Sequence, residues 1–154
     1  MLNKSSVSFD ENSHTYHLDG VALSGITGMI KKHLFPDKYK DVPEETLNNA
    51  KDRGSVIHKL CELVDDLGIK DDREEVKNYI KLKEKYSMEY VCSEYLVSDN
   101  KHFATCIDKV FKSDNGYDLV DIKTTYTLDK EYLSWQLSIN AFFFELQNPG
   151  VKVN

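Results

Sequence analysis

Residues 103–125, FATCIDKVFKSDNGYDLVDIKTT, decide the fold that we expect for this chain. The segments 103–112 and 117–125 are rich in β-branched and aromatic residues, which favour strands. Between them, Asn115-Gly116 is a strong hairpin signal, because both central positions of a type I′ turn require a positive φ. The stretch therefore predicts two antiparallel strands joined by this tight turn.

The predicted pairing gathers charged side chains on one face of the hairpin. With Asn115-Gly116 as the loop, Asp108 lies opposite Lys123, and Asp121 follows on the same face because side chains alternate with period two. A diagonal pair lies about 7–8 Å apart at Cα, so one cation at ~2.1 Å from each oxygen can bridge both carboxylates. A three- or five-residue loop would instead place the aspartates on opposite faces.

A solvated strand face is the alternative interpretation of these charges. Both faces of the hairpin look covered, and a covered face with charges must pair them or bind metal. We expect the face opposite the charges to carry Phe103, Ile107, Phe111, Val120 and Ile122, and the charged face to carry also Ala104, Cys106, Val110 and Leu119.

The composition is that of one folded domain spanning residues 1–154. No apolar run approaches the ~20 residues of a membrane span, and the start resembles no signal peptide. The three scattered cysteines favour a reducing, intracellular compartment and argue against a zinc or iron–sulfur framework. A net charge of −6 is unhelpful for nucleic-acid binding, which usually shows a basic footprint.

Before the hairpin, the pattern predicts short strands over 7–23, a helix to residue 33 capped by Ser24, and a helix over 43–67. The long helix has an apolar stripe that includes Gly54, and close approach to another backbone would explain this glycine. His58 lies at the edge of the stripe, as a packed core residue or a metal ligand.

The remaining elements add two polar candidates. A capping box at residues 72–75 predicts a helix to about residue 86, and residues 89–97 read as a strand whose Glu94 is either exposed or part of the acidic cluster. The helix predicted over 127–146 is apolar almost all round, which indicates burial. A polar ridge on it, Tyr132, Gln136 and Asn140, needs partners: either a structural hydrogen-bond ladder or, through Gln136, the site.

The order Gly54-x-x-x-His58, Asp108, Asp121-Ile122-Lys123 and Gln136 resembles the PD-(D/E)XK nuclease superfamily, and within it the RecB-like and phage-type exonuclease branch. The resemblance covers residues 50–145. It implies an α/β (α+β) restriction-endonuclease-like core, in which helices flank a central mixed sheet and an N-terminal β-hairpin leads in. It also implies Mg²⁺- or Mn²⁺-dependent hydrolysis of DNA.

The resemblance also assigns roles to individual residues. Asp108 and Asp121 match the metal-binding carboxylates, and His58 matches the histidine ligand of the branch. The backbone carbonyl of Ile122 would be a further ligand, Lys123 matches the catalytic lysine, and Gln136 matches the glutamine of the last motif.

The sequence departs from the family pattern in several places. Residues 104–107 lack the glycine that often precedes the first aspartate motif, and Asn140 stands where the pattern has tyrosine. The closing strand looks truncated, so the chain reads as a fragment or a short member. The four cysteines of the iron–sulfur CRISPR-associated branch are missing.

We therefore expect a metal-dependent deoxyribonuclease, of the exonuclease kind, in recombination, repair or phage DNA metabolism. Its expected partners are DNA and a single-strand-annealing or other recombination protein, and its expected location is the cytoplasm of a bacterium or a phage host. The alternatives are a catalytically silent domain of the same fold that binds DNA or a protein, and an α+β protein whose hairpin charges are incidental.

Overall fold

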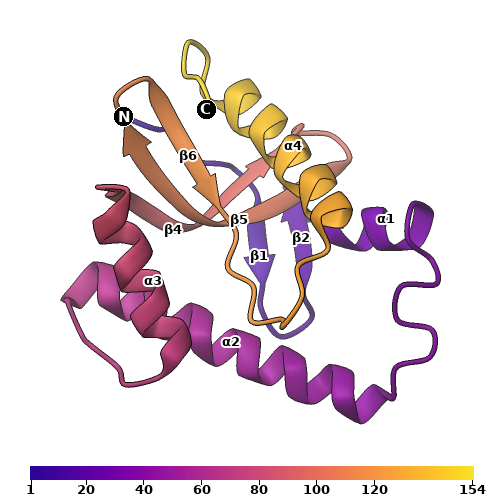
Figure 1. Ribbon diagram of the computed structural model, residues 1–154. Coiled ribbons are helices and arrows are strands. Elements are labelled where there is room, and N and C mark those ends of the chain that lie inside the picture. Colours follow the sequence, from indigo (N-terminus) through magenta and orange to yellow (C-terminus); the bar gives the residue numbers. More distant parts are fainter.

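The computed structural model describes residues 1–154 and shows a six-stranded mixed sheet with four helices (Figure 1). This arrangement confirms the expected α+β class. The elements, in chain order, are β1 (Ser8–Asp10), β2 (Thr15–Leu18), β3 (Val21–Gly25), α1 (Ile26–His33), α2 (Glu44–Leu67), α3 (Glu74–Lys85), β4 (Glu89–Ser98), β5 (Phe103–Ser113), β6 (Gly116–Val120) and α4 (Lys130–Gln147).

Strand β5 is the centre of the sheet, and two strands share one of its edges. Strand β4 pairs antiparallel with β5 along nearly its whole length. On the other edge, β3 pairs in parallel with Phe103 and Ala104, whereas β6 pairs antiparallel with residues 109–113. Neither strand pairs with residues 105–108, so the sheet opens at this edge, and Asp108 lies at the opening.

The hairpin forms, but its register differs from the prediction. Ser113 pairs with Gly116 and Lys109 with Val120, so the loop residues are Asp114-Asn115, and neither has a positive φ. The predicted type I′ turn is therefore wrong. Gly116 lies in the ladder against the C-terminal segment, where a Cβ on it would be 2.4 Å from the Lys152 carbonyl oxygen.

The change of register alters the expected relation between the two aspartates. One step beyond the last β5–β6 pair, the register would place Asp108 directly opposite Asp121 instead of diagonal to it. Strand β6 ends at Val120, earlier than predicted, and residues 121–129 form the loop to α4. The Asp121-Ile122-Lys123 motif is therefore on a loop at the open edge of the sheet.

The side chains of β5 do not alternate through its centre. Ile107 and Val110 both pack in the core beneath α1 and α4, although they lie three positions apart. Asp108 and Lys109, which are neighbours in sequence, both make polar contacts with α2. The prediction that Ile107 and Phe111 share a face is therefore wrong, because Phe111 packs on the α2 side.

Helices cover the two faces of the sheet with separate cores. On one face, α1 and α4 pack against β4 and β5 through residues such as Ile30, Val97 and Phe144. On the other face, α2 and α3 pack against Phe111. A third cluster joins the N-terminal strands to β5 at Ala104. No helix combines the length and apolar composition of a membrane-spanning segment.

The ends of the helices test the predicted caps. Helix α2 begins after Pro43 and ends at Gly68, whose φ of +66° is the left-handed conformation that suits glycine, as predicted. The predicted Ser24 cap is wrong, because Gly25 holds the cap position of α1 without a side-chain hydrogen bond. The capping box before α3 does not form either, since Arg73 at its cap makes no such bond.

Candidate metal centre

The Ile122 peptide joins the two sides of the candidate site. Its N–H donates to Asp108 Oδ2 over 2.8 Å, and its carbonyl oxygen lies 2.8 Å from His58 Nε2. Because a carbonyl oxygen only accepts, Nε2 carries the proton in this contact. The other ring nitrogen, Nδ1, lies 3.6 Å from Asp108 Oδ2. Helix α2, strand β5 and the loop after β6 therefore converge on one point.

Asp108 is a buried carboxylate with little compensation. Only 15% of its side-chain surface is exposed. Burial, and then the neighbouring charge of Asp121, raise the pKa of Asp108 to about 6, against the lowering effects of His58, the Ile122 N–H and Lys123. A carboxylate whose charge is disfavoured in this way gains from a nearby cation.

Asp121 is held from two elements and keeps one oxygen without a hydrogen bond. Gln136 on α4 donates from Nε2 to Asp121 Oδ1 over 2.7 Å. The ammonium group of Lys123 lies 2.5 Å from Asp121 Oδ2, close enough for an ion pair. The contact is short, but its angles are not those of a hydrogen bond, so the buried Oδ2 has no hydrogen-bond donor. Lys123 therefore compensates the charge of Asp121 without donating a hydrogen bond to this oxygen.

The polar ridge on α4 is buried as the sequence indicated. Tyr132, Gln136 and Asn140 are each at most 7% exposed. Of the two alternatives for the ridge, the contact of Gln136 with Asp121 favours a role at the site over a purely structural ladder. Asn140, at the place of the family tyrosine, keeps its Oδ1 without a hydrogen bond.

Glu94 belongs to the same group of side chains. Donor atoms of His58, Glu94 and Asp108 all lie within 4.8 Å of one another. Glu94 is exposed, and its φ of +50° in the middle of β4 is left-handed, which costs energy for a non-glycine residue. Neighbouring pairs, such as Ser93 with Lys109, place it across from Asp108. The sequence left its role open, because nothing in it signals the unusual backbone.

The donor atoms that lie nearest one another belong to His58, Glu94 and Asp108, and oxygen and imidazole donors are ligands that divalent ions accept. Asp121 is not part of this closest group. Oxygen and imidazole ligands at ~2.1 Å from Mg²⁺ or Mn²⁺ lie about 3 Å apart when adjacent and about 4 Å apart when opposite. The 3.6 Å between His58 Nδ1 and Asp108 Oδ2 matches neither value, so a bound ion would draw these two groups into new positions. Metal-bound histidines usually donate their second ring N–H to a carbonyl or carboxylate, as His58 does to Ile122.

Gly54 faces the loop that carries the motif, one turn before His58. A Cβ on Gly54 would lie 3.8 Å from Thr124 Oγ1, an ordinary contact, and would approach no other atom within 4 Å. The expected close approach of another backbone is therefore wrong. The glycine instead leaves open space between α2 and the loop.

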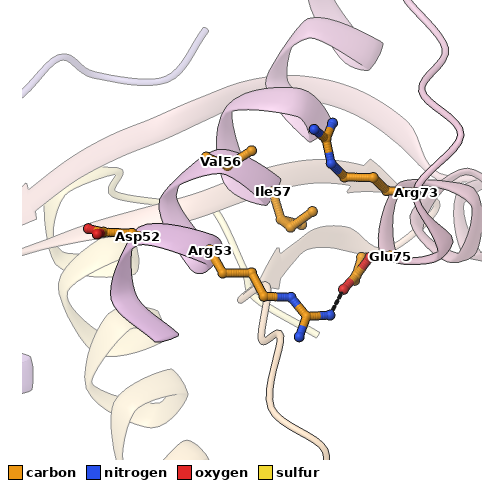
Figure 2. Close-up of a pocket in the computed structure, with 6 residues that line it drawn as sticks. All are labelled: Asp52, Arg53, Val56, Ile57, Arg73 and Glu75. Atoms are coloured by element: carbon orange, nitrogen blue, oxygen red, sulfur yellow. Dashed lines mark hydrogen bonds and ion pairs between the residues drawn. The ribbon is translucent and has the colours of Figure 1, made fainter. Parts of the chain in front are cut away.

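A pocket lies on the side of α2 that faces α3 (Figure 2). This pocket of about 450 Å³ is lined by Asp52, Arg53, Val56, Ile57, Arg73 and Glu75. Its charges are matched locally, because Arg53 pairs with Glu75 and Arg73 with Asp71. We therefore assign the site to the cluster around Asp108.

The cysteines add no further ligand group. Cys61, Cys92 and Cys106 are free thiols. Cys106 donates to Glu94 Oε2 over 3.0 Å, and burial followed by the charge of Glu94 raises the pKa of this thiol strongly. It is therefore a neutral hydrogen-bond donor at the rim of the site.

No protein-family model matches the sequence, and comparisons with curated proteins and with solved structures also give no match.

Proposed function

We propose that this protein is a metal-dependent deoxyribonuclease with a restriction-endonuclease-like core, of the RecB-like and phage-type exonuclease kind. The observation that carries the proposal is the Ile122 peptide, whose N–H binds Asp108 and whose carbonyl binds His58. Through this peptide, the Asp-x-Lys motif, the first aspartate and the helix histidine form one assembly. Asp121 Oδ2, which only the ammonium group of Lys123 approaches, adds a carboxylate oxygen that the ion could share.

Each residue has a role that its surroundings support. Asp108, Asp121 and His58 Nδ1 would hold Mg²⁺ or Mn²⁺, and exposed Glu94 would add a carboxylate. The Ile122 carbonyl, expected from the resemblance as a further ligand, instead faces the other ring nitrogen and would orient the imidazole. When bound, such an ion polarises a phosphate and lowers the pKa of a coordinated water. The hydrogen bond from His58 Nε2 to Ile122 turns Nδ1 toward Asp108.

Lys123 and Gln136 act around the carboxylates. Lys123 is partly exposed, with 29% of its side-chain surface accessible, so its ammonium group can reach a phosphate or the attacking water. Its ammonium group pairs with Asp121, and we assign it to positioning and to stabilisation of negative charge. Gln136 fixes Asp121 Oδ1 from α4.

DNA is the proposed substrate, and contacts to its phosphates would make binding largely independent of base sequence. The proposed setting is recombination, repair or phage DNA metabolism, with a single-strand-annealing or other recombination protein as a partner. A catalytically silent domain that binds DNA or a protein is the second candidate. The net charge of −6 and the contact between Lys123 and Asp121 favour it.

A cleavage assay separates the two candidates. Linear fluorescent DNA is incubated with Mg²⁺ or Mn²⁺ and wild-type protein, Asp108→Ala, Lys123→Ala, or the control Lys112→Ala, which removes an exposed lysine from the same hairpin. The nuclease loses about 10²-fold or more of its rate in the first two variants and keeps it in the control. Full activity in both site variants contradicts the proposal. DNA binding without cleavage in the wild type supports the silent domain.

A further inference from the structure

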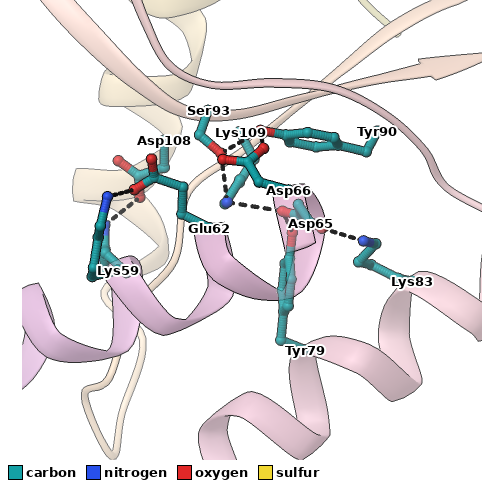
Figure 3. Close-up of polar contacts among 11 residues, drawn as sticks. Lys59, Glu62, Asp65, Asp66, Tyr79, Lys83, Tyr90, Ser93, Asp108 and Lys109 are labelled. Atoms are coloured by element: carbon teal, nitrogen blue, oxygen red, sulfur yellow. Dashed lines mark hydrogen bonds and ion pairs between the residues drawn. The ribbon is translucent and has the colours of Figure 1, made fainter. Parts of the chain in front are cut away.

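A second polar cluster lies buried beside the candidate metal centre (Figure 3). Its centre is Asp65 on α2, whose side chain has no exposed surface. This carboxylate accepts hydrogen bonds from Tyr79 over 2.6 Å and from Lys109 over 2.8 Å, and it also pairs with Lys83. The cluster therefore joins α2 and α3 to the central strand of the sheet.

Lys109 is the less exposed of the two lysines in this cluster, with 2% of its surface accessible. Besides Asp65, its ammonium group donates to Ser93 Oγ on β4 over 2.6 Å. Ser93 directly precedes Glu94, the residue with the left-handed backbone. Lys109 thus ties α2 to both strands that carry carboxylates of the candidate centre.

The two polar contacts between α2 and β5 are adjacent and run side by side. Asp108 and Lys109 are consecutive, and both point toward α2 where the alternation of β5 is interrupted (Figure 3). Their partners, His58 and Asp65, lie about two helical turns apart, which places them on one face of the helix. A shift of α2 along the strand would therefore change both contacts together.

We propose that the Asp65–Lys109 ion pair is the positioning device of the candidate metal centre, an inference that rests on the proposed function. By binding Lys109, the residue after Asp108, Asp65 fixes the rotation of α2 about its own axis and its position over β5. This sets the imidazole of His58 against Asp108 and the Ile122 carbonyl.

An ion pair supplies a constraint that the surrounding apolar contacts do not. Ile57 and Cys61 of α2 pack against Phe111, and such non-directional contacts tolerate sliding of a helix over a sheet. A buried ion pair with defined hydrogen bonds admits one arrangement, because any other leaves a charge buried without its partner. Lys83 also binds Asp65, but it lies on α3 and is 20% exposed in its side chain, so it does not link α2 to β5.

This difference between the lysines provides a matched test. Lys109→Met removes the link to β5 and keeps the length of the side chain, whereas Lys83→Met removes the other lysine partner of the same carboxylate. Asp65→Asn removes the charge that pairs with Lys109, although the oxygen that accepts from both Tyr79 and Lys109 can remain. It therefore weakens the link from the α2 side and serves if Lys109→Met fails to fold. Folding is checked by circular dichroism and thermal unfolding.

The first measurement needs no metal. In NMR spectra of the metal-free protein, we expect a slowly exchanging ring N–H of His58, held by its bond to Ile122. This signal is lost or shifted in Lys109→Met and Asp65→Asn and is kept in Lys83→Met. Its retention in folded Lys109→Met or Asp65→Asn overturns the proposal, because the pair would then stabilise the fold without placing His58.

The second measurement is Mn²⁺ affinity by calorimetry. We expect Mn²⁺ to bind ~10–100-fold more weakly to Lys109→Met and Asp65→Asn than to wild type, which is the range found for residues that hydrogen-bond metal ligands. In Lys83→Met the affinity for Mn²⁺ should stay within about twofold of wild type. Equal losses in the two lysine variants overturn the proposal. If wild type binds no Mn²⁺, the proposed function fails, and the NMR signal alone decides the positioning role.

Discussion

The side-chain amide of Gln136 donates to Asp121 Oδ1 over 2.7 Å and so links the middle of α4 to the loop that follows β6. Both groups are almost fully buried, with 5% exposure of the Gln136 residue and of the Asp121 side chain. The contact holds the carboxylate on the α4 side, while Lys123 approaches its other oxygen. The orientation of Asp121 is thus set by a helix and by its own loop together.

Replacing Gln136 tests this orientation. We expect Gln136→Leu to lower the free energy of unfolding by about 1–3 kcal/mol, because Asp121 Oδ1 loses its buried donor. Mn²⁺ affinity should fall ~10–100-fold. Urea unfolding and calorimetry measure the two effects. Asn140→Leu is the control, since Asn140 is equally buried and makes no contact with Asp121. Equal losses of Mn²⁺ affinity in both variants would show that α4 packing, and not this hydrogen bond, matters.

Asp108 predicts an unusual dependence of stability on pH. Its pKa of about 6 lies above the ~4 of an unfolded aspartate. The native state therefore holds the extra proton between these values, and the ionised carboxylate destabilises the fold above pH 6. Asp108→Asn removes this cost and keeps an acceptor for the Ile122 N–H.

We therefore expect metal-free Asp108→Asn to be more stable than wild type by about 1–3 kcal/mol at pH 7.5. The advantage shrinks as the pH falls through 6 and vanishes near pH 4. Urea unfolding with EDTA at several pH values measures it, and excess Mn²⁺ should reverse the order of stability. A variant that is less stable than wild type at pH 7.5 would mean that Asp108 is well compensated without metal.

Substitutions of Glu94 separate the strain of its backbone from the contribution of its carboxylate to metal binding. Glycine adopts a φ of +50° without cost, so Glu94→Gly should be more stable than Glu94→Ala by about 1 kcal/mol, which reverses the usual order within a strand. Thermal unfolding of the two variants measures the difference. Both should bind Mn²⁺ more weakly than wild type. If alanine is the more stable of the two, the left-handed conformation at this position is wrong.

Gly54 tests the space between α2 and the loop. A Cβ on Gly54 would make only an ordinary van der Waals contact with Thr124. Gly54→Ala should therefore raise the free energy of unfolding by about 0.5–1 kcal/mol, because alanine has the higher helix propensity. Gly54→Val, with a branched side chain against Thr124, should lose this gain. Urea unfolding distinguishes the two. A destabilised alanine variant would show that the helix approaches the loop more closely than the structure indicates.

The sequence predicted the elements well because their signals are local. The helix from Pro43 to Gly68 follows from start and stop residues and an apolar stripe, and β5 follows from its β-branched run. The shared strand face expected for Asp108 and Asp121 stays a prediction, because β6 ends before Asp121: Asp108 turns toward α2, whereas Gln136 on α4 binds Asp121. The exact register of the hairpin was not predictable, because it involves the C-terminal segment that packs on Gly116.

The rest of the site depends on tertiary contacts that leave no local pattern. Period two places Lys109 on the apolar face of the hairpin beside Phe111, and nothing in the sequence indicates that Asp65 of α2 binds it there. The role of Glu94 depends on one backbone angle and on its place beside Asp108. The regular alternation of side chains along a strand predicts neither feature, because both lie where the strands depart from that alternation.

Diffraction from Mn²⁺-soaked crystals at the manganese absorption edge tests the central claim most directly. The account predicts one strong anomalous peak bounded by His58 Nδ1, Asp108 and Asp121, and its loss in Asp108→Ala crystals. No peak at that position in wild-type crystals at saturating Mn²⁺, or a peak that persists unchanged in Asp108→Ala, would contradict it.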